Sequence, residues 1–383
     1  MEFVTTGADR TTGSLEHHAT RIVFFIAGFS LAAWAPLVPF AKARAGLGEG
    51  MLGLLLLGLG AGSIATMPLA GAISSRLGCR LVMTVSAILL CLSLPLLATV
   101  STAPHLAAAL VAFGASIGAL EVTMNIQAVI VERASRRPMM SGFHGLFSVG
   151  GIAGSVGVTA LLGAGASPLT ATLCVVAAII IAFALAWAHL LPYGSRAQGP
   201  VFALPHGIVL FIGMLCFICF LTEGAVLDWS AVFLTSARGM QPTYAGLGYA
   251  AFAASMTVGR LTGDRIVWRL GGSNVVMIGA VLAATGFLVT TMLPSWHIAL
   301  LGYALVGCGC SNIVPVLYTG VGRQTAMPEH IAVPAITTFG YLGILAGPAA
   351  IGFVARASSL GTAFLILAVL LLGVAAGGRL LRT

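Results

Sequence analysis

Residues 104–132 read PHLAAALVAFGASIGALEVTMNIQAVIVE, and the interior of this run holds a single charged side chain, Glu121. About twenty consecutive apolar residues are enough for an α-helix to cross the hydrocarbon core of a bilayer, which is about 30 Å thick. The apolar residues here are continuous rather than alternating, which favours a helix over a barrel strand. The run therefore predicts a transmembrane helix with a carboxylate near its middle.

The rest of the chain repeats this pattern. Of its 383 residues, 59% are hydrophobic and only 7% are charged, and the mean hydropathy is +1.06. Such a composition indicates a membrane protein, whose backbone polar groups must be satisfied internally. We therefore predict an all-α membrane protein with twelve transmembrane helices, at residues 21–42, 50–73, 80–101, 104–132, 139–164, 168–191, 205–233, 242–265, 273–293, 296–320, 328–355 and 358–378.

The distribution of Lys and Arg predicts the orientation. With the N-terminus placed in the cytoplasm, only Lys42, Arg44, Arg238 and Arg356 of the 18 Lys and Arg fall outside, and Arg260 is among those inside. This positive-inside bias predicts that both termini are cytoplasmic. The bias and anionic lipid head groups account for the net charge of +8, so we expect no nucleic-acid partner. The first apolar run is long enough to span, so we expect no cleavable signal peptide.

A loop at 192–205, PYGSRAQGPVFALP, separates two sets of six spans. The expected organisation is a cytoplasmic tail (1–20), a six-helix bundle (21–191), a cytoplasmic linker (192–204), a second six-helix bundle (205–378) and a C-terminal tail (379–383). Each half carries a basic turn after its second span: GAISSRLGCR at 71–80 and GRLTGDRIVWR at 259–269. Many transporters are built from such duplicated halves and place their site at the midplane between them.

Twelve spans, the six-plus-six division and the first basic turn resemble the major facilitator superfamily over essentially the whole chain. The turn signature of that family is G-x-L-a-D-R-x-G-R-R. The resemblance implies two pseudo-symmetric bundles that open alternately to the two sides of the membrane. It also implies that the residues of the basic turns act in gating. Gly71, Arg76, Gly78 and Arg80 match, whereas Ser75 stands where the family usually has Asp. The second turn supplies the corresponding candidates Arg260, Asp264 and Arg265.

Five further strings narrow the resemblance. They are WAP at 34–36, EVTMN at 121–125, HGLFSVG at 144–150, EGAVLDW at 223–229 and GYLGILAGP at 340–348. Together they resemble the YbjJ-like bacterial inner-membrane branch, which is similar to the fucose-permease group of sugar/proton symporters. The resemblance implies a multi-pass protein of the bacterial inner membrane with a small-molecule substrate. That group has an acid in span 4, as Glu121 is here, and another in span 1, which this chain lacks.

Glu121 is the first candidate for proton coupling. An ionisable group inside a span costs free energy, and it usually marks an ion or substrate pathway. Asn125 follows one turn later on the same helix face, where it could hydrogen-bond a substrate. The alternative is that Glu121 ties two helices together through an interhelical hydrogen bond.

Glu223, in the outer half of span 7, is the second candidate, followed by Asp228 and Trp229. The resemblance implies that span 7 unwinds near here, and Gly224 would permit it. The acids would then form a second titratable site or an external gate, with Trp229 near the substrate. The alternative is that Asp228 caps the outer helix end in water while Trp229 lies in the interfacial aromatic belt.

Among the His within the expected spans, His144 lies furthest from a span end. Its charge changes between pH 5 and 8, and it lies within about two helical turns of the depth of Glu121, which suits a proton relay. A neutral His bonded to a backbone carbonyl or a Ser is the alternative.

The remaining substrate-binding candidates are aromatic or polar side chains inside spans. Trp34 is either a stacking platform for a ligand or a packing residue. Possible hydrogen-bond partners of a substrate are Gln127, Asn312, Tyr318 and Tyr341.

Several function classes find no support. The seven Cys show no metal-ligand spacing, and Cys216 and Cys219 lie in an apolar helix without His neighbours, so we expect reduced thiols and no metal. There is no phosphate loop or HExxH motif and no nucleotide-binding domain. We therefore expect neither an enzyme nor a primary pump, no cofactor beyond the proton gradient, and a monomer.

The leading hypothesis is a proton-coupled secondary transporter, of the symport type, for a small polar, sugar-like solute bound between spans 1, 4, 7 and 10. The first alternative is a proton-coupled efflux antiporter for amphipathic compounds. Span 5 reads GGIAG at 150–154, without the Pro of the antiporter signature, which argues against it. The second alternative is a non-transporting sensor or scaffold, for which the short loops leave little room.

Overall fold

The computed structural model describes residues 13–195, 203–241 and 244–381, and this part of the chain forms helices and no strand. Its α-helices are α1 (Ser14–Ala33), α2 (Val38–Arg44), α3 (Glu49–Leu77), α4 (Cys79–Thr99), α5 (Ala103–Ser135), α6 (Met140–Gly163), α7 (Pro168–Trp187), α8 (Gly207–Arg238), α9 (Leu247–Leu270), α10 (Gly272–Met292), α11 (Trp296–Cys310), α12 (Ile313–Arg323), α13 (Glu329–Ala357) and α14 (Leu360–Gly378). Two short 3-10 segments are η1 (Ala35–Leu37) and η3 (Arg379–Leu381).

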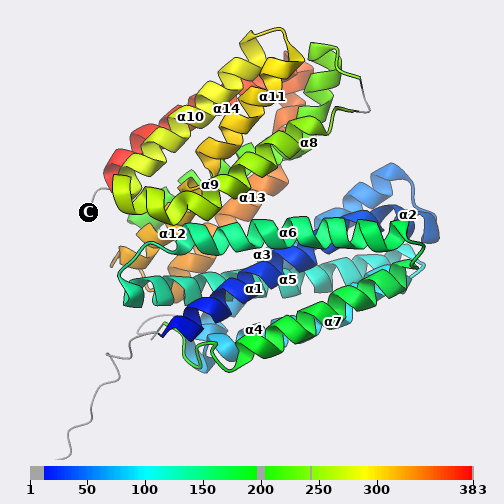
Figure 1. Cartoon of the computed structure of the whole chain (residues 1–383), viewed down its shortest axis with the longest axis vertical. Coiled ribbons are helices and arrows are strands. Elements are labelled where there is room, and N and C mark those ends of the chain that lie inside the picture. Colours follow the sequence, from blue (N-terminus) through cyan, green and yellow to red (C-terminus); the bar gives the residue numbers. More distant parts are fainter. Residues whose placement is uncertain (1–12, 196–202, 242–243, 382–383) are drawn as a thin grey trace, which may run out of the picture.

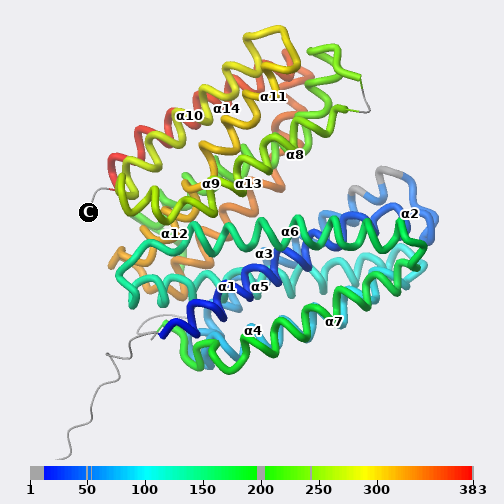
Figure 2. Tube along the Cα trace, in the orientation of Figure 1, coloured from blue at the N-terminus to red at the C-terminus, as the bar shows by residue number. Residues whose placement is uncertain are grey.

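The helices form two bundles, α1–α7 and α8–α14, which lie one above the other in Figure 1 and follow each other along the trace in Figure 2. The first span consists of α1, η1 and α2, and the tenth of α11 and α12. Eleven of the spans in the described residues are long and apolar enough to cross a membrane. The remaining one is α9, which carries Arg260, Asp264, Arg265 and Arg269. The predicted all-helical architecture is confirmed in the described residues, and eleven of the twelve expected spans are candidate membrane spans. Most of the expected linker (196–202) and tail residues 1–12 and 382–383 lie outside the described residues.

Two spans are interrupted near their middle. In span 1, α1 ends at Ala33, and Pro36 at the start of η1 provides no N–H for the helical ladder. In span 10, the break falls at Ser311 and Asn312. Pro315 lies four residues after Ser311, so the Ser311 carbonyl has no helical donor. Interrupted membrane helices leave polar backbone groups exposed where a binding cavity can use them.

Span 7 is continuous, in contrast to the expected unwinding at Gly224. The helix α8 runs without interruption to Arg238 and ends where Gly239 adopts a left-handed conformation, with φ of 65°. Since α8 extends beyond the predicted end at residue 233, Glu223 lies at the middle of the helix rather than in its outer half. The prediction that span 7 unwinds at Gly224 was therefore wrong.

Close helix packing depends on glycines in α6. A Cβ at Gly150 or Gly154 would collide with the backbone carbonyl of Phe25 or Phe29 in α1. Small residues allow such backbone approach between membrane helices. By contrast, a Cβ at Gly157, one turn further along α6, would meet nothing within 4 Å.

This contrast gives a stability prediction. We expect Gly154→Leu to destabilise the protein by about 2 kcal/mol or more, because the added side chain forces α1 and α6 apart. The matched variant Gly157→Leu should unfold with nearly the wild-type midpoint. Thermal unfolding in detergent measures both, and equal midpoints for the two variants would contradict the close α1–α6 contact.

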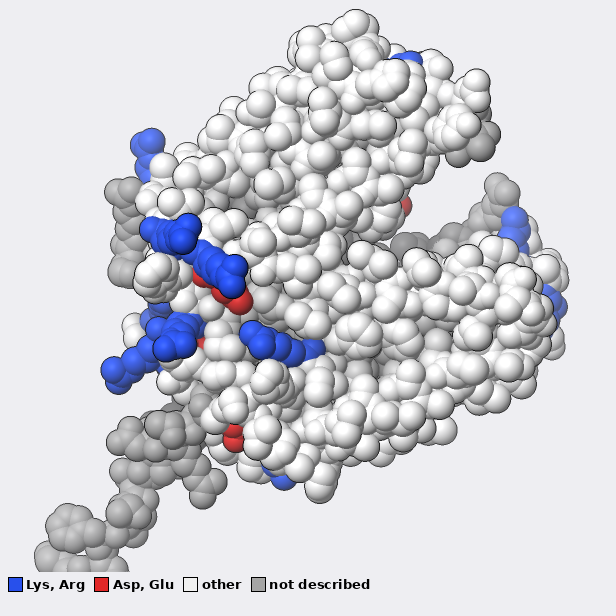
Figure 3. Space-filling view, viewed as in Figure 1, with Lys and Arg blue, Asp and Glu red and all other residues white. Residues whose placement is uncertain are grey.

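The two bundles meet at one end of the molecule and separate at the other. We call the closed end the side where α1 begins and α14 ends, and the open end the opposite side, where Figure 3 shows a cleft between the bundles. Towards the closed end, α6 packs against α9, where a Cβ at Gly145 would meet Leu261, and α3 packs against α13, where a Cβ at Gly71 would meet Pro334. The structure is therefore open to one side only.

Candidate functional site

Glu121 connects the two bundles near the centre of the molecule. It lies midway along α5, is 8% exposed, and accepts a hydrogen bond of 2.6 Å at Oε2 from the hydroxyl of Tyr341 on α13. Asn125 lies on the same face, and its amide donates to the Glu121 carbonyl oxygen at 2.8 Å. The structure thus joins two of the candidate residues, Glu121 and Tyr341, from opposite halves of the sequence.

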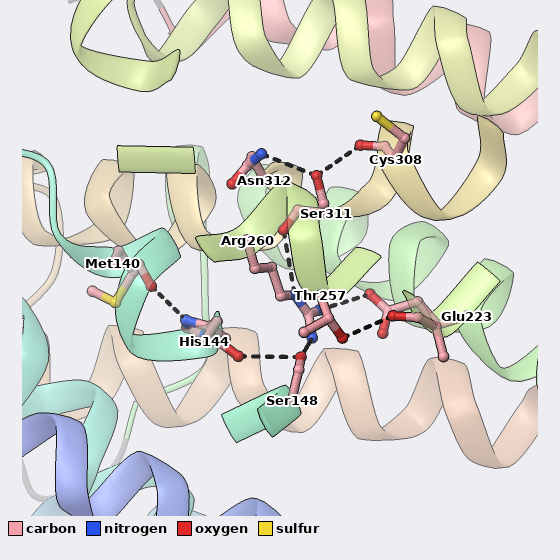
Figure 4. A network of polar contacts seen from close by, with 10 residues as sticks. Met140, His144, Ser148, Glu223, Thr257, Arg260, Cys308, Ser311 and Asn312 are labelled. Atoms are coloured by element: carbon pink, nitrogen blue, oxygen red, sulfur yellow. Dashed lines mark hydrogen bonds and ion pairs between the residues drawn. The ribbon is translucent and has the colours of Figure 1, made fainter. Parts of the chain in front are cut away.

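Glu223 is paired with a buried arginine. Its Oε1 lies 3.5 Å from Nη2 of Arg260 on α9, and the two side chains are 17% and 9% exposed. Arg260 Nη1 donates to Ser148 Oγ on α6 at 3.0 Å, and its Nε donates to the Ser311 carbonyl at 3.3 Å. Figure 4 shows the guanidinium between these three groups. One cation therefore links an acid of the second bundle, a hydroxyl of the first and the break in span 10.

The position of Arg260 corrects the sequence prediction, which placed it in a cytoplasmic basic turn. The helix α9 continues to Leu270, ten residues or about 15 Å beyond Arg260. The turn follows at Gly271, whose φ of 76° matches the φ of 88° at Gly78. The string Arg-Leu-Gly precedes both turns, at Arg76 and at Arg269. Alignment on that string would have assigned Arg260 to the span interior.

Asn312 secures the break in span 10. Its amide nitrogen donates to the Gly259 carbonyl at 3.0 Å and to Ser311 Oγ at 2.9 Å. The side chain fits against α9 only because residue 263 is glycine, since a Cβ there would overlap Asn312. Asn312 therefore positions the Ser311 carbonyl that receives Arg260.

His144 lies beside this network and makes no hydrogen bond to Glu121 in the part of the chain described. Its Nδ1 donates to the Met140 carbonyl at 3.0 Å, and its ring packs against Phe24 and Tyr318, with centroids 5.2 and 5.5 Å away. The Tyr318 hydroxyl lies 2.7 Å from the Thr337 hydroxyl. This geometry favours the backbone-bonded His over a direct relay to Glu121.

Both polar atoms of the Gln127 amide already have a protein partner. Gln127 is fully buried; its Nε2 donates to Thr20 Oγ1 at 3.0 Å, and its Oε1 accepts from the Leu191 amide at 2.9 Å. These bonds join α5, α1 and the end of the first bundle. The contacts indicate a structural role.

Four of the substrate-binding candidates retain an unused polar atom. The atoms Trp34 Nε1, Asn125 Oδ1, Trp229 Nε1 and Asn312 Oδ1 are buried and find no hydrogen-bond partner among the described residues. They belong to spans 1, 4, 7 and 10. Asp228 is exposed, and within the described residues it makes no hydrogen bond or ion pair. An unused buried polar atom costs about 1–3 kcal/mol, which a bound polar solute could recover.

Two acids from other helices, Glu132 of α5 and Asp264 of α9, bind the start of α6 and stabilise the closed end. Glu132 accepts from the amides of Met139 and Met140 at 2.7 and 2.8 Å, and from Thr319 Oγ1 of α12 at 2.5 Å. Asp264 of α9 accepts from the Gly142 amide at 3.0 Å. Carboxylates stabilise the positive end of a helix dipole and its unpaired amides. Both acids bind one helix end while connecting it to the second bundle.

An ion pair between Arg133 of α5 and Glu329 of α13 adds to this closed end. Glu132, Arg133 and Glu329 were not among the residues singled out from the sequence. Charges at span ends are expected in any membrane protein, so they carried no distinguishing signal. Only the folded chain shows that they meet across the bundles.

The first basic turn has a different role from the second. Arg80 donates to the carbonyls of Leu190 and Ala188, both at 2.8 Å, and covers the Trp187 ring, while Ser75 Oγ donates to the Ala72 carbonyl. Arg76 and Arg265 are exposed. These contacts stay within the first bundle. Of the two turns, only the second therefore supplies a carboxylate, Asp264, that contacts the opposite bundle.

Asp264 therefore provides a test of the closed end. Asp264→Ala removes the cap on α6, worth about 1 kcal/mol, and should shift the balance towards opening at this end about fivefold. Spin labels at residues 76 and 269, in a background without the seven native Cys, would report a broader and longer distance distribution. Asp228→Ala is the matched control, and an equal shift in both variants would contradict the gating role.

No group of three or more metal-ligating side chains occurs among the described residues. Cys216 and Cys219 are buried free thiols on α8.

Comparisons with known proteins agree with this architecture. A sequence model of the family described as Major Facilitator Superfamily matches residues 22–332. An uncharacterized MFS-type transporter of Yersinia pestis is 55% identical over 368 residues, which cover 96% of each chain. A variant of the E. coli fucose:proton symporter FucP superimposes with a TM-score of 0.79 at 16% identity, covering 96% of this chain and 98% of FucP. FucP in the outward conformation gives a TM-score of 0.81 at 17% identity, with the same coverage.

Proposed function

This chain belongs to the major facilitator superfamily, a family of membrane transporters and not of enzymes, and we propose that it is a proton-coupled secondary transporter of a small polar, sugar-like solute. Proton and solute would move in the same direction by alternating access of the central cleft. The proposal places the protein in the bacterial inner membrane as a monomer, with both termini and the closed end in the cytoplasm.

The observation that carries the proposal is the pair of buried acids linked to the opposite bundle. Glu121 reaches Tyr341 directly, and Glu223 reaches Ser148 through Arg260. Rocking of the bundles must break or rearrange these contacts. Their strength depends on the charge of the two carboxylates, because charge-assisted hydrogen bonds are about twice as strong as neutral ones. Proton uptake would thereby alter the balance between the two conformations.

The unused polar atoms support a polar solute. Trp34 and Trp229 offer buried N–H donors, and Asn125 offers an acceptor. A molecule with several hydroxyl groups can satisfy donors and acceptors together, whereas an apolar compound would leave all three unpaired. The fold similarity to FucP, a fucose:proton symporter, is in keeping with such a solute.

The test begins with purified protein and a thermal-shift screen of sugars, organic acids and drugs at two pH values. We expect hydroxylated solutes to raise the unfolding midpoint, and the best of them to accumulate in proteoliposomes under an inward proton gradient. Stabilisation only by amphipathic drugs, with raised drug resistance on expression, would replace the proposal with efflux. Binding of no compound and no flux would favour a sensor or scaffold.

A further inference from the structure

A basic pocket lies at the closed end, away from the central acids. Its cavity of about 300 Å³ is formed where the turn between α5 and α6 meets the end of α12. Four arginines line it: Arg133, Arg136, Arg137 and Arg323. Lys and Arg side chains gather at this side of the molecule in Figure 3. We call this cavity the arginine pocket.

Three of the four arginines in the arginine pocket have no ion-pair partner among the described residues. Arg133 pairs with Glu329. Arg136, Arg137 and Arg323 are exposed, and none forms an ion pair or hydrogen bond through its side chain to the described residues. The one acid in the lining, Glu132, already binds two amides and the Thr319 hydroxyl. Three guanidinium groups therefore face one small cavity.

The backbone of Arg136 adopts a conformation that is energetically unfavourable for a residue with a Cβ. Arg136 has φ of 52°, and it is the only non-glycine residue with positive φ in the described chain. The left-handed conformation costs about 1–2 kcal/mol for a residue with a Cβ, so Gly or Asn would be favoured on local grounds. Arg136 is the C-terminal cap of α5, a position where a left-handed conformation is common and Gly is the usual residue. Arginine therefore stands where the backbone alone would favour Gly.

We propose that the arginine pocket binds a phosphate group, either of a soluble phosphate or of an anionic lipid head group. The planar guanidinium matches phosphate oxygens in pairs, and an anion would relieve repulsion among the arginines. The positive-inside rule explains cations at this face, but it does not explain why three unpaired ones line a cavity between two moving bundles.

Because the pocket has walls from both bundles, its ligand acts on conformation. Arg136 and Arg137 belong to the first bundle, and Arg323 and Thr319 belong to the second. A phosphate held between them binds the closed form and not a form in which the bundles separate here. The phosphate therefore inhibits opening of this end, since a ligand shifts an equilibrium by its differential affinity for the two states.

The experiment uses the full chain and two sources of phosphate. In detergent, thermal unfolding is followed against inorganic phosphate at constant ionic strength, with chloride as the balancing salt. In nanodiscs, unfolding is compared between phosphatidylcholine alone and phosphatidylcholine with phosphatidylglycerol. A saturable rise in the midpoint in detergent identifies soluble phosphate, and a rise confined to phosphatidylglycerol nanodiscs identifies the lipid.

The variant Arg136→Gln/Arg323→Gln should weaken the effect at least tenfold in apparent affinity. The matched control Arg76→Gln/Arg379→Gln removes two exposed arginines from the same side but outside the pocket, and it should respond as the wild type does. Equal weakening in both double variants, or no saturable effect from either source, would overturn the site. In the 76/269 spin-labelled protein, phosphate should narrow the distance distribution, and an unchanged distribution with phosphate bound would overturn the inhibitory role.

Discussion

Glu121→Gln is expected to abolish solute accumulation driven by a proton gradient while solute exchange across the membrane continues. Gln has nearly the shape of Glu and can still accept the hydrogen bond from Tyr341, which is 2.6 Å long in the wild type. It cannot bind or release a proton. Exchange requires only that the loaded carrier reorient, whereas net uptake requires the proton to leave. With a proton gradient present, the variant should therefore accumulate no more solute than it does without one.

The measurement uses proteoliposomes with the solute found in the thermal-shift screen. Gradient-driven uptake and counterflow are recorded for wild type, Glu121→Gln and Glu16→Gln. Glu16 lies in the first turn of α1 at the closed end and serves as a matched carboxyl outside the centre. Tyr341→Phe removes only the hydrogen-bond donor and should retain some coupling. Gradient-driven accumulation by Glu121→Gln at the wild-type level would exclude Glu121 as the proton carrier.

Arg260→Met is expected to lower the free energy of unfolding by about 3 kcal/mol, because it leaves the Glu223 carboxylate buried without its cation. The methionine also loses the bonds to Ser148 and Ser311. Adding Glu223→Gln to this variant should restore much of the stability by removing the unpaired charge. Arg260→Lys should be intermediate, because a single ammonium cannot reproduce the fork that reaches three partners.

Equilibrium unfolding in mixed detergent micelles, carried out as a double-mutant cycle over Arg260 and Glu223, measures this coupling. We expect a coupling energy of about 1–3 kcal/mol between the two positions. The double variant should fold. Additive effects of the two substitutions would show that the 3.5 Å approach carries no stabilising interaction.

Particular residues show how much of the candidate site could be predicted from the sequence. Glu121 and Glu223 stood out because a carboxylate among apolar residues is rare and costly in a membrane. The partner of Glu121 could not be assigned, since Tyr341 lies 220 positions away and is one of several polar side chains in spans. Arg260 was misplaced because its neighbours Asp264 and Arg265 look like the end of a helix that in fact continues to Leu270.

The sequence alone determined the membrane architecture, because the cost of exposing polar backbone to lipid forces every long apolar run into a helix. It also identified the side chains whose burial in a membrane costs free energy. The tertiary structure decided which of those side chains meet. Pro315 frees the Ser311 carbonyl for Arg260, and Gly263 makes room for Asn312. Such contacts depend on atomic distances between helices far apart in the chain, and local periodicity contains no information about them.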